Sequence, residues 1–446
     1  MEIIKLQVSK RLILCFFISI IFSFNCDNNN PNWIRIYGGD GVENVARVIE
    51  SYDNGYIIAG STNSFGADPY QQVFSDVYEG TSDGWLIKIN NSGKIIWQNT
   101  YGQASNENFW DIQYSNEGGY ILAGEKDIYH DRNSLWVLKI DQSGNIIWEK
   151  SITGDKTYRA ESIQKTGDAY IICGNVVDFE KAFVIKLNED GSINWEKYFT
   201  LYKNNACLNV KATIDGGFIL LGTTGDFKNE KMDYWVIKLD NKGDVLWSKI
   251  YDSSGNDSPS EITVTTDGGY ILGGSTYIPW QSKSGLWVLK TDSDGNIQWQ
   301  KKYSNKYAFI NFGYFTLDDD GSIVMVGYFD YGILIIKINP NGDIQWQTNY
   351  NLFSYYSNFI NHTKDNGYII SALSREFNIM ILKINNNGDM SGGCFNDYNS
   401  DNNIYSEDTN AYPSNTTINV VNSNSLIAET NVEIFDSYSG NKSFCD

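Results

Sequence analysis

Residues that could carry out a reaction are few in this chain. It contains only two histidines, His130 and His362, and neither stands at a metal-ligand spacing or beside a serine nucleophile pattern. Zinc sites and serine triads both need such arrangements. A pair of carboxylates that hydrolyses glycosidic bonds stays open, because the 54 acidic residues allow many combinations and none stands out. The sequence therefore predicts no catalytic residue and no cofactor, and it leaves open whether the protein is an enzyme.

Aspartates gather in short turns such as TDSDG (291–295) and LDDDG (317–321). Carboxylate oxygens bind Ca²⁺, but a full calcium loop spans about twelve residues and ends in a bidentate glutamate. These turns are shorter and lack that glutamate. We therefore interpret the aspartates as turn formers, which hydrogen-bond their own backbone, and predict no metal site.

The elements that must position these residues repeat along the chain. Residues 287–303, WVLKTDSDGNIQWQKKY, alternate apolar and polar positions on both sides of a tight turn, which is the pattern of a β-hairpin. The turn and its following tryptophan recur every 47 to 52 residues, ending at Trp97, Trp148, Trp195, Trp247, Trp299 and Trp346. A period of this length is typical of β-propellers, in which each repeat is one four-stranded blade.

The number of blades follows from the other strands. The strand before the turn and a strand such as GYILAG (119–124) each occur seven times. The seventh unit, residues 351–390, lacks a tryptophan strand after its turn, whereas residues 32–39, NWIRIYGG, match that strand. The sequence therefore predicts an all-β fold, a seven-bladed β-propeller of four-stranded antiparallel blades in which the N-terminal strand closes the last blade and removes an open sheet edge.

One lysine recurs in the third strand of every predicted blade. The seven are Lys88, Lys139, Lys186, Lys238, Lys290, Lys337 and Lys383. A ring of ammonium groups would suggest an anion site, but third strands lie about 10 Å further from the axis than first strands, so the groups cannot converge. We expect each stem to pack between blades while its head reaches a carboxylate or carbonyl oxygen.

The repeat resembles the tryptophan-docking repeats of quinoprotein-like propellers. In units such as WVLKIDQSGNIIWEK (136–150), the tryptophan stands four residues after the turn glycine. The likeness to bacterial seven-bladed repeats of this type covers residues 32–390 and implies that the aromatic side chain docks between blades. The plan also resembles that of envelope lipoproteins of the outer-membrane assembly type. The chain lacks the Cys-Cys dipeptide that quinone dehydrogenases carry over their cofactor, so the resemblance implies an architecture and no ligand.

The N-terminus predicts export. Basic residues precede the apolar run of residues 12–24, which is too short to span a membrane but fits a signal peptide, assigned to residues 1–25. The sequence SFNC that ends at Cys26 resembles a lipobox, although its first and third residues depart from the usual pattern. We predict that Cys26 is lipidated, that residues 26–31 form a spacer, and that the protein lies in the bacterial cell envelope, anchored to the outer membrane or cell surface. Plain secretion is the alternative.

The C-terminal residues 391–446 are rich in Asn, Ser and Asp and are interpreted as an appendage to the propeller. TINVV (417–421) and NVEIF (431–435) are expected to form a small hairpin. Cys394 and Cys445 bracket this segment and are predicted to form a disulfide in an oxidising compartment.

Connections of variable length are expected on one face of the propeller, because the loops from second to third strand and from blade to blade emerge together. We call this the loop-rich face; its longest loop is residues 64–83. Variable loops on a rigid scaffold are common binding sites. The residues predicted to bind a ligand are Tyr70, Tyr78, Phe109, Trp110, Tyr129, His130, Tyr277 and Trp280. In the alternative interpretation, several of them only cover the ends of the blades.

The leading hypothesis is a non-catalytic cell-envelope lipoprotein whose propeller binds a protein or glycan through the loop-rich face. The alternative is a polysaccharide-acting lyase or hydrolase with its site in the central funnel, which a convergence of Arg, Glu and Tyr at the funnel mouth would favour. The formal net charge of −20 argues against a nucleic-acid partner and against a basic membrane-binding face. We expect a monomer that contacts the membrane through its lipid anchor.

Overall fold

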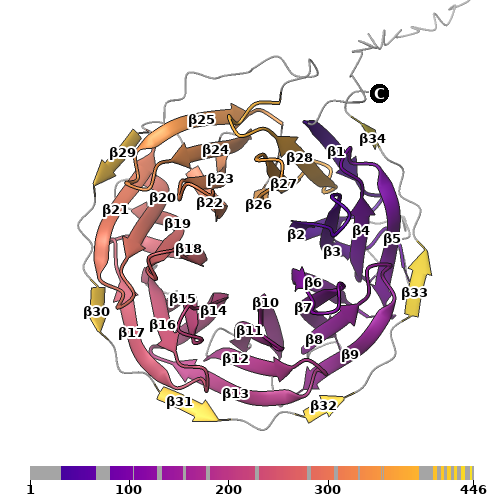
Figure 1. Ribbon diagram of the computed structural model, residues 1–446, viewed down its shortest axis with the longest axis horizontal. Coiled ribbons are helices and arrows are strands. Elements are labelled where there is room, and N and C mark those ends of the chain that lie inside the picture. Colours follow the sequence, from indigo (N-terminus) through magenta and orange to yellow (C-terminus); the bar gives the residue numbers. More distant parts are fainter. Residues whose placement is uncertain are drawn as a thin grey trace, which may run out of the picture.

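The computed structural model is a ring of β-sheets around a central axis (Figure 1). It describes residues 32–66, 81–103, 105–127, 133–153, 157–176, 181–226, 231–278, 283–305, 310–329, 332–352, 354 and 356–390, and six short tail strands within 405–443. Cys26, Cys394 and Cys445 lie outside the described residues. No helix long and apolar enough to cross a membrane occurs in the described part of the chain.

The ring consists of seven antiparallel blades, which confirms the predicted fold. Blade 1 comprises β2 (Glu43–Glu50), β3 (Tyr56–Thr62), β4 (Asp83–Ile89) and β5 (Ile95–Gly102). Blade 2 comprises β6 (Glu107–Tyr114), β7 (Tyr120–Asp127), β8 (Asn133–Ile140) and β9 (Ile146–Thr153). Blade 3 comprises β10 (Tyr158–Thr166), β11 (Ala169–Val176), β12 (Lys181–Asn188) and β13 (Ile193–Thr200). Blade 4 comprises β14 (Asn204–Ala212), β15 (Phe218–Asp226), β16 (Lys231–Leu239) and β17 (Val245–Tyr251).

The remaining blades follow the same order from the axis outward. Blade 5 comprises β18 (Asn256–Val264), β19 (Tyr270–Ile278), β20 (Lys283–Thr291) and β21 (Ile297–Ser304). Blade 6 comprises β22 (Ile310–Leu317), β23 (Ile323–Phe329), β24 (Gly332–Ile338) and β25 (Ile344–Tyr350). Blade 7 comprises β26 (Tyr356–His362), β27 (Tyr368–Leu373), β28 (Ile379–Ile384) and β1 (Trp33–Tyr37).

The seventh blade is closed by the two ends of the propeller chain. β1 pairs antiparallel with β28, with Trp33 opposite Lys383 and Tyr37 opposite Ile379. The predicted closure by the N-terminal strand is therefore confirmed. Figure 1 shows the indigo β1 beside the late strand β28.

Each outer strand docks on the turn between the third and fourth strands of the next blade. Trp33 Nε1 donates to the carbonyl oxygen of Asn91 at 2.8 Å, and the Tyr37 hydroxyl donates to that of Gly93 at 2.6 Å. Gly93 has a φ of 79°, and a Cβ there would lie 3.0 Å from the Trp33 ring. The equivalent turn glycines also lie against the aromatic side chains of the preceding blade: Gly144, Gly191, Gly243, Gly295, Gly342 and Gly388. Glycine is favoured there because it tolerates both the left-handed backbone and the close ring.

The core is divided among the blade junctions. Seven hydrophobic clusters are found among the described residues, each built from two neighbouring blades. Trp85, Trp136, Trp235 and Trp287, which begin the apolar runs of their third strands, are at most 1% exposed. No blade can bury both of its faces alone, so the closed ring is the unit that folds.

The C-terminal segment adds short strands to the outside of the ring. These are β29 (Tyr405–Asp408), β30 (Pro413–Asn415), β31 (Asn419–Asn422), β32 (Leu426–Ala428), β33 (Glu433–Asp436) and β34 (Lys442–Ser443). They pair in turn with the outermost strands of blades 5, 4, 3, 2, 1 and 7, against the order of the blades. The expected hairpin is wrong, because β31 and β33 pair with β13 and β5 rather than with each other. Exposed outer edges offer free backbone groups, which these strands satisfy (Figure 1).

Candidate axial pocket

All seven innermost strands contain an irregularity at the same place. The pairing of the first with the second strand skips a residue after Val45, Phe109, Ala160, Cys207, Pro259 and Ser357, and two residues after Phe312. Such a β-bulge bends its strand and changes the direction of the next side chains. The side chains after the bulges meet near the axis.

Arg47 is the centre of this meeting point. Its Nε lies 2.8 Å from Asp111 Oδ1 and its terminal nitrogen lies 3.8 Å from Glu261 Oε2. The guanidinium stacks over the ring of Phe359 at 4.1 Å and lies 5.8 Å from that of Tyr314. These residues come from blades 1, 2, 5, 7 and 6, so one side chain links five innermost strands.

The two remaining blades join the same network through its carboxylates. The backbone N–H of Ile163 in blade 3 donates to Asp111 Oδ2 at 2.8 Å. Lys211 Nζ in blade 4 lies 2.8 Å from Glu261 Oε1. All seven blades therefore contribute to one layer, which we call the Arg47 layer.

The charged groups of the Arg47 layer are buried, which makes their charges costly unless they are paired. Arg47 is 5% exposed and Asp111 is fully buried. Burial opposes the charge of Arg47, but Asp111 and Glu261 outweigh it and raise the pKa of Arg47. Burial raises the pKa of Asp111, while Arg47 and the backbone N–H of Ile163 oppose that rise. A buried charge of this kind is tolerated only when it is paired and hydrogen-bonded.

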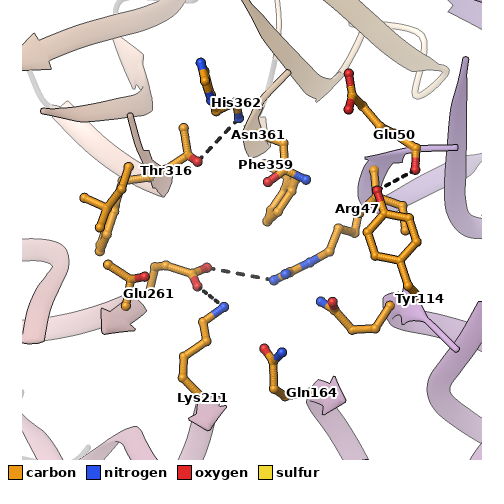
Figure 2. Close-up of a pocket in the computed structure, with 15 residues that line it drawn as sticks. Arg47, Glu50, Tyr114, Gln164, Lys211, Glu261, Thr316, Phe359, Asn361 and His362 are labelled. Atoms are coloured by element: carbon orange, nitrogen blue, oxygen red, sulfur yellow. Dashed lines mark hydrogen bonds and ion pairs between the residues drawn. The ribbon is translucent and has the colours of Figure 1, made fainter. Parts of the chain in front are cut away.

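A pocket of about 360 Å³ lies on the axis beside the Arg47 layer (Figure 2). Its lining consists of residues that follow the bulges: Arg47, Ile49, Glu50, Gln113, Tyr114, Gln164, Lys211, Glu261, Thr263, Phe315, Thr316, Leu317, Phe359, Asn361 and His362. The later residues of the innermost strands lead to the short turns into the second strands. The pocket therefore lies toward the short-turn face, opposite the loop-rich face.

Most charged groups of the pocket already have partners. Glu261 binds Lys211 and Arg47, and Glu50 accepts the backbone N–H of Lys364 at 3.0 Å. The Tyr114 hydroxyl donates to the carbonyl oxygen of Glu50 at 2.8 Å. Burial, together with Glu50, raises the pKa of Tyr114 to about 12, so the hydroxyl is neutral at pH 7.

Amide and imidazole groups complete the wall. Gln113 in β6 and Gln164 in β10 are half-buried and come from neighbouring blades. Figure 2 labels Gln164 in the pocket wall. Asn361 Nδ2 donates to the carbonyl oxygen of Val48 at 3.1 Å, and His362 Nε2 lies 3.7 Å from Asp318 Oδ1. Together with the aromatic rings, these groups give a pocket that can donate and accept hydrogen bonds while stacking on a flat ligand surface.

Three of the predicted ligand-binding residues lie within the described chain. Phe109 is 1% exposed and stacks on Trp136 at 4.5 Å, which places it in the core between blades 1 and 2. Trp110 occupies the bulge of β6 and is half-buried beneath the guanidinium of Arg159, 4.2 Å from its ring. Tyr277 is half-buried in β19. None of the three lines the axial pocket.

The other five predicted residues, Tyr70, Tyr78, Tyr129, His130 and Trp280, lie outside the described residues. The prediction of a binding site on the loop-rich face therefore remains a prediction. Arg159, which covers the Trp110 ring, also contacts Glu161. Burial raises the pKa of Glu161 to about 7 despite the neighbouring Arg159 at 3.0 Å.

The recurring lysines do not form an anion site, as expected. Six of them pair with acids: Lys88 with Asp53, Lys139 with Glu189, Lys238 with Asp215, Lys290 with Asp267, Lys337 with Asp318 and Lys383 with Asp365. Lys186 Nζ donates to the carbonyl oxygen of Asn241 at 3.5 Å. The prediction that each head reaches a carboxylate or carbonyl oxygen is confirmed.

The sequence did not predict the residues of the axial pocket, because they differ from blade to blade and belong to no repeated motif. The second, third and fourth strands are similar in every blade, whereas the position after the bulge is occupied by Arg47, Asp111, Glu261 or Phe359. A search for charged residues at one fixed position of the innermost strand, whose sequence repeats least clearly, could have found them. That signal needs the bulge to be known, since one skipped residue reverses which face a side chain occupies.

Fold and site together define a seven-bladed β-propeller whose axis is crossed by a buried ionic layer and holds a polar pocket. No family model and no curated protein matches this chain. Among solved structures, it is similar to a protein from Lactobacillus plantarum, with 12% identity and a TM-score of 0.45 over 81% of this chain and 99% of that one.

Two further similar structures are hydrazine synthase from Kuenenia stuttgartiensis and Drosophila Plexin A in complex with Semaphorin 1b. The first has 11% identity and a TM-score of 0.42 over 66% of this chain and 77% of that one. The second has 7% identity and a TM-score of 0.37 over 78% of this chain and 88% of that one. All three likenesses are distant, and the fold assignment rests on the strand pairing of the chain itself.

Proposed function

We propose that the protein is a non-catalytic binding protein of the bacterial cell envelope and that its axial pocket takes part of a glycan. The observation that carries this proposal is the lining of the pocket. Gln113, Gln164 and Asn361 offer amide groups, and Tyr114 and Phe359 offer aromatic surface, within about 360 Å³. This volume lies within the usual range of about 300–1,000 Å³ for ligand sites.

A sugar suits this combination of groups. Its hydroxyls both donate and accept hydrogen bonds, as amide side chains do, and its carbon-bound face packs against aromatic rings. A folded protein domain is too large for the pocket, so a protein partner would have to bind the loop-rich face. Binding of a protein or glycan by that face, with Trp110 and Trp280 as contacts, is the alternative location of the site.

The state of the charged groups favours binding over catalysis. Glycosidases need one carboxyl group as an acid and another as a base or nucleophile. Here Glu261 is ion-paired with Lys211 at 2.8 Å, and Glu50 accepts a backbone hydrogen bond. Tyr114, whose pKa is raised to about 12, is a poor base at pH 7. One observation supports the alternative of a polysaccharide lyase or hydrolase, namely that Arg47, Glu261 and Tyr114 line one pocket.

The envelope location is supported by the N-terminal sequence. The apolar run of residues 12–24 and the cysteine at position 26 suit export followed by lipidation. The protein would then contact the membrane through its lipid anchor. A basic face is not expected to bind the membrane, because the chain carries a formal net charge of −20. We propose that the protein acts as a monomer.

The test is a glycan array with the mature protein, followed by calorimetry on each oligosaccharide that binds. Replacing Gln113 and Gln164 by alanine should weaken binding by at least about tenfold, because each loses hydrogen bonds made in a confined site. Gln142→Ala, on an exposed turn, is the matched control and should bind like the parent.

Two outcomes would contradict the proposal. Binding that is unaffected in both pocket variants would place the ligand elsewhere. New reducing ends, or the ultraviolet absorbance of an unsaturated uronate, would establish the enzymatic alternative.

A further inference from the structure

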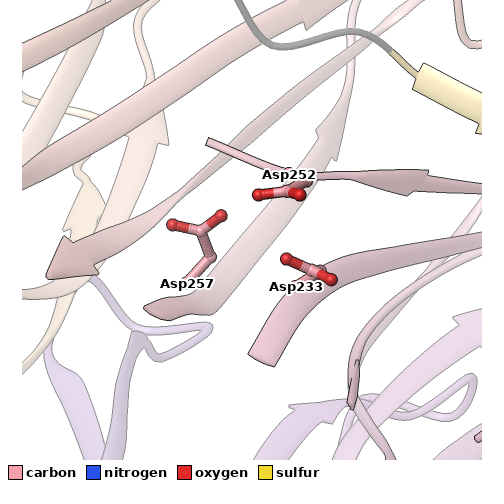
Figure 3. Close-up of side chains that lie close together, drawn as sticks. All are labelled: Asp233, Asp252 and Asp257. Carbon is pink, nitrogen blue, oxygen red and sulfur yellow. The ribbon is translucent and has the colours of Figure 1, made fainter. Parts of the chain in front are cut away.

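Three acidic side chains meet at the junction of blades 4 and 5, on the loop-rich face. Asp233 lies near the start of β16, Asp252 directly follows β17, and Asp257 lies at the start of β18. One carboxylate oxygen of each lies within 4.8 Å of the others. Figure 3 shows the three carboxylates facing one shared space.

The carboxylate of Asp233 faces this space with one of its two oxygens unpartnered. Asp233 is 9% exposed, and its Oδ1 is buried and has no hydrogen-bond partner. Leaving a buried acceptor unsatisfied costs stability, so such an atom calls for a ligand that the protein itself does not supply. This atom is distinct from those of Asp257, which accept the N–H and O–H of Ser253.

Among the described residues, a single lysine offsets the negative charge of the three carboxylates. Lys231 Nζ lies 3.3 Å from Asp252 Oδ2, and the lysine side chain is 60% exposed. Burial and the neighbouring carboxylates raise the pKa of Asp233 to about 7, and burial raises the pKa of Asp257 to about 6.

The junction of blades 1 and 2 lacks the third acid of this cluster. Between blades 1 and 2, the corresponding residues are Asp83, Gly102 and Glu107. A Cβ on Gly102 would lie 1.7 Å from Asp83 Oδ1, so that junction has no room for a third side chain. Asp252 occupies the position of this glycine, directly after the fourth strand.

We propose that Asp233, Asp252 and Asp257 bind a divalent cation, with Ca²⁺ preferred over Mg²⁺. All the ligands are oxygens, which suits both ions. Three oxygens within 4.8 Å of one another can each lie within about 2.8 Å of a common point, close to the Ca–O distance of about 2.3–2.6 Å, so one Ca²⁺ can reach all three. Mg²⁺ needs about 2.0–2.1 Å and near-octahedral geometry, which fewer arrangements of three carboxylates satisfy. The ion would tie the connection between β17 and β18 to the start of β16.

The experiment is calorimetric titration of the chelator-treated mature protein with CaCl₂ at pH 7. We expect one ion per chain and an increase in Tm with added Ca²⁺. Asp252→Asn should weaken binding by at least about tenfold, because it removes one of three formal charges. Its side chain is 37% exposed, so this variant should fold.

The matched control is Glu107→Gln, which removes the acid at the corresponding position of blade 2 and should leave Ca²⁺ binding unchanged. Sensitised luminescence of Tb³⁺, which replaces Ca²⁺ at oxygen sites, gives a second measurement because Tyr234 and Tyr251 adjoin the cluster in sequence. Absence of binding at 10 mM Ca²⁺, on the order of ten times the weakest usual extracellular affinity, would overturn the proposal. Binding that survives Asp252→Asn and Asp233→Asn would overturn the assignment of the site.

Discussion

Trp33 lies opposite Lys383 in the pairing of β1 with β28, so the first and last strands of the propeller share one blade. The same tryptophan donates its indole N–H to Asn91 in blade 1. The residue therefore holds the N-terminal strand in the last blade through its backbone and joins that blade to blade 1 through its side chain. Opening the ring at this point would expose a sheet edge and the cluster that contains Trp33, Tyr56 and Ile381.

Deleting residues 27–38 should destabilise the whole ring. The change removes β1 and a tryptophan that is 7% exposed, and truncating one buried tryptophan costs about 3–5 kcal/mol. Urea denaturation followed by tryptophan fluorescence would measure the loss. Deleting only residues 27–31 is the matched control. A 27–38 deletion that melts within a degree or two of the parent would contradict closure by β1.

The difference between what the sequence predicted and what it missed has a physical cause. The strand that contains Trp148 and the turn at Gly144 recur because every junction needs the same docking contact, so the fold could be predicted from one chain. The contact of Arg47 with Asp111 could not be predicted, because the two residues belong to different blades and meet at 2.8 Å only in the folded ring. The tail strands also pair through backbone groups, which impose little pattern on Asn- and Ser-rich sequence.

Replacing Arg47 by methionine should cost about 3–5 kcal/mol of unfolding free energy. Methionine keeps the stem over Phe359 but leaves the buried carboxylates of Asp111 and Glu261 without their common partner. Denaturant titration would measure the loss. Arg159→Met, at a side chain that is 44% exposed, should change stability by less than about 1 kcal/mol. Equal stabilities of the two variants would argue against the Arg47 layer as a structural centre.

Stability should fall as pH rises from about 4.5 to about 7, partly because of Glu161. Its pKa is raised from 4.5 to about 7 by burial, so the folded chain holds this proton more tightly than the unfolded chain. The stabilisation is complete below pH 4.5 and is lost as the pH reaches 7, by at most about 3 kcal/mol. Denaturant titrations across this range should show a smaller decrease for Glu161→Gln, which stays neutral. Asp233 and Asp257 contribute in the same direction in both proteins, so the difference between the two curves isolates Glu161.

Replacing Cys26 by serine should move the protein from the membrane fraction to the soluble fraction. The reason is that serine cannot accept the thioether-linked lipid that the lipobox-like sequence suggests. Mass spectrometry of the mature N-terminus would check the acyl chain directly. Cleavage at another residue without an acyl chain would favour plain secretion.

The final prediction separates the two faces of the propeller. If the loop-rich face binds the ligand, Trp110→Ala and Trp280→Ala should each weaken binding, because a large flat side chain gives much contact area at low entropy cost. Shortening the loop of residues 64–83 should weaken binding with little change in stability, since surface loops tolerate changes of length. Binding by calorimetry and unfolding by urea would be measured for the same variants.

The axial pocket predicts the opposite pattern. Gln113→Ala and Gln164→Ala should then each weaken binding by at least about tenfold, whereas the three changes on the loop-rich face should leave it intact. Trp110 needs a stability control, because its ring packs under Arg159 at 4.2 Å and truncation also removes that contact. Arg159→Met loses the same contact while keeping the tryptophan. A ligand that requires Trp110 but tolerates Arg159→Met must touch the indole itself, and that result would assign the working site to the loop-rich face.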